Sequence, residues 1–132
     1  MPPASILVVD DEPDLVETIR FRLEQEGHQV LTAGDGLEAL ATARSAEPDL
    51  MVLDVMMPGE NGYRVAHQLR EDEAAGRIGR RIRIILLTAR DLRSDPEREQ
   101  TFMEFSQADL MLYKPFDLEE LVARVEELLE KK

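Results

Sequence analysis

Five short, mostly apolar runs, each followed by a longer amphipathic stretch, constrain the fold of this chain more than any other feature. The runs are residues 6–9, 30–33, 50–53, 82–87 and 110–113. Their continuous apolar character indicates strands that are buried on both faces, because a strand with one solvent face alternates apolar and polar residues. A strand followed by a helix, five times over, predicts an α/β fold: a doubly wound five-stranded parallel sheet with five helices.

Residues with strong conformational preferences mark the expected helix ends. Pro13 suits the first turn of a helix, where a missing N–H costs nothing, and Gly27 is typical of the residue just beyond a helix. Asp35 and Asp95 are expected to cap the helices that follow them. The second of these helices carries Phe102 and Phe105 on one side.

Two segments are expected to be loops. Residues 55–62 contain Pro58, Gly59 and Gly62, which favour turns, and residues 71–79 lose their apolar periodicity and contain two glycines. No internal repeat and no second domain is apparent. The chain, at 132 residues, is therefore expected to form a single domain over residues 1–132.

The composition excludes several classes of function. Sixteen basic and 28 acidic residues give a net charge of −12, which disfavours direct binding to nucleic acid or to an anionic membrane. The absence of Cys excludes thiol catalysis, disulfides and thiolate metal sites. No stretch approaches the roughly 18 apolar residues of a membrane span, so we expect no membrane insertion. A cytoplasmic location suits this composition.

Four of the five apolar runs end in side chains that can carry chemistry. The carboxyl ends of parallel strands meet at one edge of a sheet, so these residues are expected to converge. Three carboxylates in one cleft repel each other and need a cation, and an all-oxygen site favours Mg²⁺. A carboxylate beside such an ion can attack a phosphoryl group, with Lys and Thr stabilising its oxygens. The residues are Asp10, Asp11, Asp54, Thr88 and Lys114.

Four motifs, in this order, resemble the receiver domain of bacterial two-component response regulators. The motifs are residues 6–12 (ILVVDDE), 54–59 (DVMMPG), 87–89 (LTA) and 114–116 (KPF), and the resemblance covers nearly the whole chain. It implies a flavodoxin-like sheet with strand order 2-1-3-4-5 in a single receiver domain. It also implies a domain that catalyses only its own phosphorylation and dephosphorylation, rather than a conventional enzyme.

The resemblance implies a role for each matching residue. Asp54 would be the phosphoacceptor, Thr88 would hydrogen-bond the phosphoryl group, and Lys114 would pair with it. The peptide bond between Lys114 and Pro115 would be cis. The Mg²⁺ ligands would be Asp10, Asp11, Asp54 and the main-chain carbonyl of Met56.

The chain departs from the family pattern at three places. Two segments, 71–83 and 90–106, each contain about one helical turn more than is usual. Met111 occupies the position, three residues before the Lys, where many members have an aromatic switch residue. Tyr113 lies two residues further on and points to the same side of its strand. We expect the flexible Met111 side chain to follow a movement of Thr88 without a sharp rotamer change, and Tyr113, next to Lys114, to register the change more directly.

A basic cluster stands out in this acidic chain. Arg77, Arg80, Arg81 and Arg83 precede or begin the fourth predicted strand. The simplest interpretation is a solvated loop with ion pairs, and the alternative is a docking patch for an acidic partner. By topology, this loop lies at the amino end of the strand, away from the predicted chemistry.

Three classes of function are consistent with the fold. The leading hypothesis is a phosphorylation-activated switch that receives its phosphoryl group from a histidine kinase or histidine phosphotransfer protein and acts on a downstream effector or fused output domain. The second is a phosphorylation-independent receiver-like interaction module. The third, a phosphatase or nucleotide-binding enzyme, is disfavoured because the chain has neither G-x-x-x-x-G-K nor G-x-G-x-x-G. The sequence is compatible with a stand-alone regulator and with the receiver of a longer protein.

Overall fold

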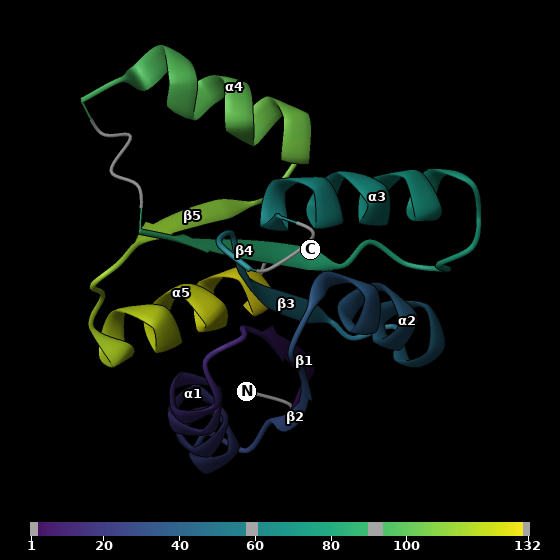
Figure 1. Cartoon of the computed structure of the whole chain (residues 1–132). Helices are drawn as coiled ribbons and strands as arrows, with labels where there is room; N and C mark the ends of the chain where they lie inside the picture. Colours follow the sequence, from purple (N-terminus) through teal and green to yellow (C-terminus); the bar gives the residue numbers. More distant parts are fainter. Residues whose placement is uncertain (1–2, 58–60, 90–93, 131–132) are drawn as a thin grey trace.

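A computed structural model describes residues 3–57, 61–89 and 94–130 of the chain. One sheet contains five parallel strands in the order β2-β1-β3-β4-β5, which confirms the predicted fold class and strand order (Figure 1). Pro58 and Gly59 of the predicted loop, and residues 90–93 of the second longer segment, lie outside the described residues. The strands are β1 (Ser5–Val9), β2 (Gln29–Ala33), β3 (Leu50–Asp54), β4 (Arg83–Thr88) and β5 (Leu110–Tyr113).

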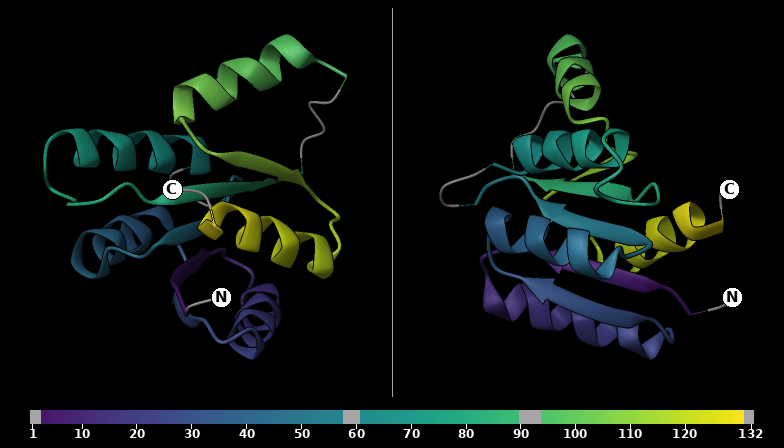
Figure 2. Two further views of the ribbon diagram at one scale, coloured as in Figure 1. Left: turned by 180° about the vertical axis from the view of Figure 1, so that it is seen from behind. Right: turned by 90° about the vertical axis from the view of Figure 1, so that its right-hand side faces the viewer.

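Five helices cover both faces of the sheet, as expected for a doubly wound fold (Figure 2). The helices are α1 (Pro13–Gln25), α2 (Gly36–Ala46), α3 (Gly62–Ala74), α4 (Pro96–Ser106) and α5 (Leu118–Glu130). Helices α1 and α5 pack on one face, and α2 and α3 pack on the other. None of the helices in the described part of the chain is long and apolar enough to cross a membrane.

The two hydrophobic cores explain why the strand sequences are apolar without interruption. In β1, Leu7 and Val9 point into the core under α2 and α3, while Ile6 and Val8 point into the core under α1 and α5. All five residues of β3 are buried. Because both faces of each central strand are covered, the positions between its two ends are apolar.

The predicted helix ends are confirmed at four positions. Pro13 is the first residue of α1, and Gly27, beyond its end, has the left-handed φ of 93° that glycine adopts readily. Asp35 caps α2 and Asp95 caps α4, each by accepting a hydrogen bond from the backbone N–H three residues on, at 2.8 and 3.2 Å.

The predicted loop over residues 71–79 is wrong in its first part, because α3 continues to Ala74. Asp72 lies in this last turn, fully buried, between the guanidinium groups of Arg44 and Arg77, each 2.8 Å away. Burial alone would raise the pKa of Asp72, but the hydrogen bonds from these two groups lower it below its ordinary value. The buried residues of this turn are charged, so the apolar periodicity disappears while the helix continues.

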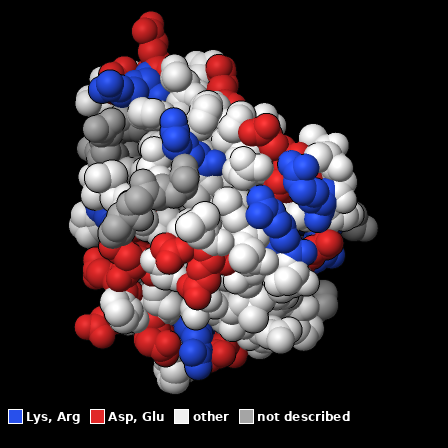
Figure 3. Space-filling view, turned by 45° about the vertical axis from the view of Figure 1, so that its right-hand side comes forward, with Lys and Arg blue, Asp and Glu red and all other residues white. Residues whose placement is uncertain are grey.

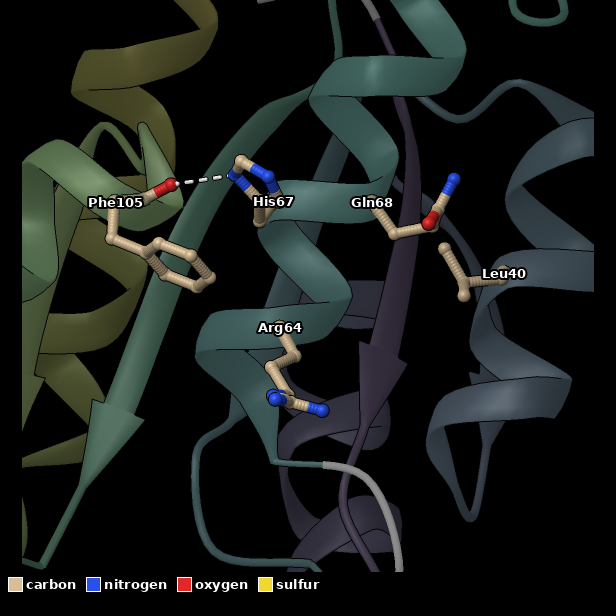
Figure 4. Close-up of a pocket in the computed structure, with 5 residues that line it drawn as sticks. All are labelled: Leu40, Arg64, His67, Gln68 and Phe105. Carbon is tan, nitrogen blue, oxygen red and sulfur yellow. Dashed lines mark hydrogen bonds between the residues drawn. The ribbon is translucent and has the colours of Figure 1, made fainter.

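Helix α4 is attached to α3 by two aromatic stacks. The rings of Tyr63 and Phe102 lie 4.4 Å apart, and those of His67 and Phe105 also lie 4.4 Å apart. The His67 Nδ1–H donates to the carbonyl oxygen of Phe105 at 2.9 Å (Figure 4). Phe102 and Phe105 therefore share one side of α4, as predicted. A hollow of about 300 Å³ between α2, α3 and α4 adjoins the second stack, and it is lined by Leu40, Arg64, His67, Gln68 and Phe105.

Candidate functional site

The carboxyl ends of the strands bring the predicted site residues together. Asp10 directly follows β1, Asp54 is the last residue of β3, Thr88 is the last residue of β4, and Lys114 directly follows β5. The backbone N–H of Lys114 donates to the carbonyl oxygen of Thr88 at 2.8 Å, so the hydrogen-bond ladder between β4 and β5 extends to the site. Residues far apart in the sequence are thus held at one edge of a rigid sheet.

Three carboxylates form the centre of this site. Each of Asp10, Asp11 and Asp54 offers an oxygen, and these oxygens lie within 4.8 Å of one another. Asp10 and Asp54 are buried, at 3% and 2% exposure, whereas Asp11 is exposed. Three like charges at this spacing repel each other unless a cation lies between them. The exposed position of Asp11 leaves the cluster open to solvent on one side.

The orientation of Asp10 is suitable for binding a metal ion either directly or through a metal-bound water. One oxygen, Oδ1, accepts a hydrogen bond from the backbone N–H of Glu12 at 3.0 Å. The other, Oδ2, is buried and makes no hydrogen bond within the described part of the chain. Lys114 Nζ approaches this oxygen only to 3.5 Å, so the buried Oδ2 retains the capacity to bind a further cation. An all-oxygen donor set of this kind fits Mg²⁺.

Lys114 supplies the positive charge of the site. Its Nζ lies 3.1 Å from Asp54 Oδ1 and 3.5 Å from Asp10 Oδ2. Burial opposes the charged form of Lys114, but the hydrogen bond and charge of Asp54, together with Asp10, raise its pKa above the ordinary value. Lys114 is therefore a fixed cation beside Asp54. The bond between Lys114 and Pro115 is cis, as the family resemblance implied.

The surroundings of Asp54 disfavour the charged form of its carboxyl group. Burial and the nearby Asp10 raise the pKa of Asp54 above its ordinary value, although Lys114 opposes this. The backbone N–H of Met56 donates to Asp54 Oδ1 at 3.4 Å. Thr88 is fully buried, and a hollow of about 210 Å³ adjoins both it and Met56. Asp54 is thus a poorly solvated carboxylate next to a cation, at the same edge of the sheet as Thr88.

Gly62 has a role at the site that the sequence did not reveal. It was recognised only as a loop residue, yet it is the first residue of α3 and its N–H donates to the carbonyl oxygen of Val55 at 2.9 Å. A Cβ at this position would lie 2.5 Å from the carbonyl oxygen of Asp54 and 2.8 Å from the Cα of Val55. Glycine here allows the start of α3 to close over the backbone of Asp54.

We expect Gly62→Ala to destabilise the protein by about 1–3 kcal/mol, the range typical of overpacking, because neither backbone atom can move freely. Urea unfolding monitored by circular dichroism would measure this change. Gly34→Ala is the matched control, since a Cβ there meets only a Glu38 side-chain oxygen at 3.9 Å. Equal stabilities of the two variants would contradict the close-approach argument.

The fold and the site together define a class of protein. A doubly wound sheet with an acid cluster, a Lys and a Thr at its carboxyl edge is the arrangement of a signalling domain that uses a carboxylate and a divalent cation. The chain belongs to the response regulator receiver domain family, whose model matches residues 6–126. The family consists of receiver domains of two-component systems rather than conventional enzymes. Receiver domains bind Mg²⁺ at an acidic pocket, which here consists of Asp10, Asp11 and Asp54.

Characterised relatives are response regulators that are longer than this chain. A probable transcriptional regulatory protein of Mycobacterium tuberculosis, TcrX, is 41% identical over 127 residues, which cover 96% of this chain and 50% of TcrX. The alkaline phosphatase synthesis transcriptional regulatory protein PhoP of Bacillus subtilis is 41% identical over 124 residues, covering 94% of this chain and 48% of PhoP. The chain spans about half the length of these relatives.

Solved structures of receiver domains match nearly the whole fold. The response regulator TrrA of Thermotoga maritima, in complex with Mg²⁺ and BeF, is 38% identical with a TM-score of 0.76, and the match covers 94% of this chain and 97% of that one. The receiver domain of a Francisella response regulator is 30% identical with a TM-score of 0.82, covering 96% and 97% of the two chains.

Proposed function

We propose that the chain is a phosphorylation-activated switch of a two-component phosphorelay in which Asp54 accepts the phosphoryl group. The observation that carries this proposal is the position of Lys114 Nζ, 3.1 Å from Asp54 Oδ1, beside three carboxylates whose oxygens lie within 4.8 Å. A buried carboxylate held between a cation and a metal-binding cluster is equipped to become an aspartyl phosphate.

Each residue has a defined part in the proposed transfer. An oxygen of Asp54 attacks the phosphorus of a phosphohistidine, the bond from phosphorus to the donor imidazole breaks, and its electron pair stays on the imidazole nitrogen. Lys114 and the hydroxyl of Thr88 stabilise the phosphoryl oxygens. Mg²⁺, when bound, neutralises charge on the transferred group. It would be held by Asp10, Asp11, Asp54 and the carbonyl of Met56.

We further propose a cytoplasmic histidine kinase or histidine phosphotransfer protein as the donor. The output would come from a fused domain or from a separate effector protein, since transcriptional regulators of about twice this length are among the relatives. The receiver itself would not contact nucleic acid, because its net charge is −12. Residues 1–132 would form one receiver domain.

Intact-mass spectrometry with Mg²⁺ and phosphoramidate tests this function. We expect one added phosphoryl group, and none when EDTA removes the metal, because self-catalysed transfer needs the cation. Acetyl phosphate serves as a second small donor. A chain that binds neither Mg²⁺ nor a phosphoryl group would instead be a phosphorylation-independent interaction module.

Tyr113 is placed to report the state of the site. It lies opposite Thr88 in the register of β4 and β5, and its O–H donates to the carboxylate of Glu99 on α4. Met111, at the usual switch position, packs within the hydrophobic core. A change at Thr88 therefore has a short route to α4 through Tyr113, and Glu99 is the partner that no sequence signal indicated.

We predict that Mg²⁺ with beryllofluoride, a phosphoryl mimic, changes the fluorescence or the ring NMR signals of Tyr113. The chain has no Trp and only two Tyr, so a Tyr63→Phe background isolates the signal. Asp54→Asn should abolish the change, and Glu99→Gln should alter its size. A silent Tyr113 alongside shifts elsewhere in α4 would show that the signal leaves by another route. A response that survives Asp54→Asn would show that Tyr113 senses only the ion.

A further inference from the structure

The amino end of the sheet carries a basic surface on an otherwise acidic protein. Basic side chains gather on the side of the molecule where α2 and the connection from α3 to β4 lie, and those in these segments are arginines (Figure 3). Arg44, Arg77, Arg80 and Arg81, which we call the arginine platform, have side chains that are 43–57% exposed. The net charge of the whole chain is −12. The longer segment noted in the sequence, 71–83, provides three of the four arginines.

Buried acids hold the first half of the platform in place. Asp72 is fully buried, and its two oxygens accept from Arg44 Nε and Arg77 Nε, each at 2.8 Å. One carboxylate thus faces two guanidinium groups, so this part of the platform keeps a net positive charge. The acid lies beneath the surface and the cations lie on it.

Ion pairs also hold the second half of the platform. Arg80 Nη1 lies 2.6 Å from Asp49 Oδ1, and Arg81 Nη2 lies 2.8 Å from Asp109 Oδ1. Asp109 also pairs with the buried Arg70, at 3.1 Å, and Arg70 pairs in turn with Glu73, at 2.9 Å. The charges of this half are therefore balanced, and the excess positive charge of the platform comes from the two arginines on Asp72. The predicted ion pairs are therefore present, but each acid is less exposed than the platform arginine it contacts.

These ion pairs orient the guanidinium groups but do not use all of their N–H donors. A guanidinium has five N–H donors in a planar fork, and each of these pairs uses only part of the fork. Groups that are already oriented lose little side-chain entropy when a further anion binds. A hollow of about 590 Å³ beside Arg80 and Arg81 is also lined by Glu73, whose charge is paired with Arg70 at 2.9 Å. Ala74, Gly76 and Gly79 line it as well, and these small residues leave room for an incoming chain.

We propose that the arginine platform is a docking surface for an acidic segment of a partner protein, rich in Asp and Glu. Carboxylates match the guanidinium fork in charge and geometry. A longer polyanion such as duplex DNA would extend beyond the platform onto the acidic remainder of the surface, where it would be repelled. The platform is therefore suited to a short acidic peptide segment that enters the hollow.

Docking at this surface is expected to be independent of phosphorylation. Arg83 begins β4 at the amino end of the sheet and Thr88 ends it at the site, so a six-residue strand separates the two regions by about 20 Å. That separation exceeds the Debye length of about 8–10 Å at ordinary salt. The platform would thus hold the receiver near a partner in both states of Asp54.

Fluorescence anisotropy with a labelled octaglutamate peptide tests this proposal on the full chain. Arg80→Gln/Arg81→Gln leaves Arg77 and the buried Asp72 pair intact and is expected to weaken binding roughly tenfold, which corresponds to two lost exposed ion contacts. The matched control is Arg20→Gln/Arg124→Gln, which removes two arginines from intrahelical pairs on α1 and α5. Both variants have the same net charge, −12 − 2 = −14.

The controls separate this proposal from folding effects and from the proposed function. The Arg80→Gln/Arg81→Gln variant should be phosphorylated by phosphoramidate at an unchanged rate. The affinity of the wild type for the peptide should change less than about twofold when Mg²⁺ and beryllofluoride are added, because salt screens charges that are separated by more than a Debye length. In the wild type, Arg Nε–H NMR shifts caused by octaglutamate should map to the platform.

Three results would overturn the proposal. Equal weakening of peptide binding in both double variants would show a bulk charge effect. Tighter binding of duplex DNA than of octaglutamate would identify a different class of partner. Platform-dependent self-association without peptide, measured by analytical ultracentrifugation, would identify the acidic occupant as a second copy of this chain.

Discussion

Asp54→Asn is expected to abolish the gain of a phosphoryl group from phosphoramidate. The amide keeps the size of the side chain and its place at the end of β3 but removes the nucleophilic oxygen. Asp10 is similarly buried, but its Oδ2 lies farther from Lys114 Nζ, at 3.5 Å compared with 3.1 Å for Asp54 Oδ1. Intact-mass spectrometry over a time course measures the loss.

Asp95→Asn is the matched control for this substitution. It makes the same chemical change at the cap of α4, where Asn caps about as well as Asp. It should therefore leave both the stability and the phosphorylation rate nearly unchanged. If Asp54→Asn still gains a phosphoryl group at a comparable rate, and peptide mapping places it on another acid, the assignment of Asp54 is wrong.

Asp11→Ala is expected to weaken Mg²⁺ binding far more than Glu12→Ala. Asp11 belongs to the cluster of carboxylate oxygens within 4.8 Å, whereas the carboxylate of Glu12 does not. Glu12 is the N-cap residue of α1, and its side chain makes no capping hydrogen bond. Removing a partner of a metal ligand typically costs roughly 10–100-fold in metal affinity, and losing a ligand should cost at least as much.

The pair of variants separates coordination from simple charge. Each removes one negative charge from adjacent positions, so a long-range electrostatic effect would weaken Mg²⁺ binding similarly in both. A titration with Mg²⁺ followed by NMR distinguishes these cases. Equal losses of affinity for Asp11→Ala and Glu12→Ala would show that Asp11 is not a ligand.

Much of the fold was predictable because its signals are local. Continuous apolar runs mark strands covered on both faces, and the β1 residues Leu7 and Val8 do point into opposite cores. The caps at Asp35 and Asp95 also act within one turn of their own helix. The candidate site was predictable for a related reason, since parallel topology alone brings strand ends such as Asp54 and Lys114, 60 residues apart, to one edge.

The last turn of α3 shows where local reasoning fails. Residues 71–74 were predicted as loop because they have no apolar face, yet they are helical. The turn is stabilised by Asp72, whose partners Arg44 and Arg77 come from α2 and from the following connection. Apolar periodicity cannot reveal a buried surface whose members are charged and paired across elements.

The sequence by itself determined which segments are strands, where most helices begin, and which side chains meet at the carboxyl edge, because each depends on local preferences or on the topology of a parallel sheet. Only the tertiary structure decided the contacts that join separate elements. These are the approach of Gly62 to the backbone of Asp54, the hydrogen bond from Tyr113 to Glu99, and the arginine platform. Each of these contacts depends on the distance between separate elements, and the spacing of residues along the chain does not predict that distance.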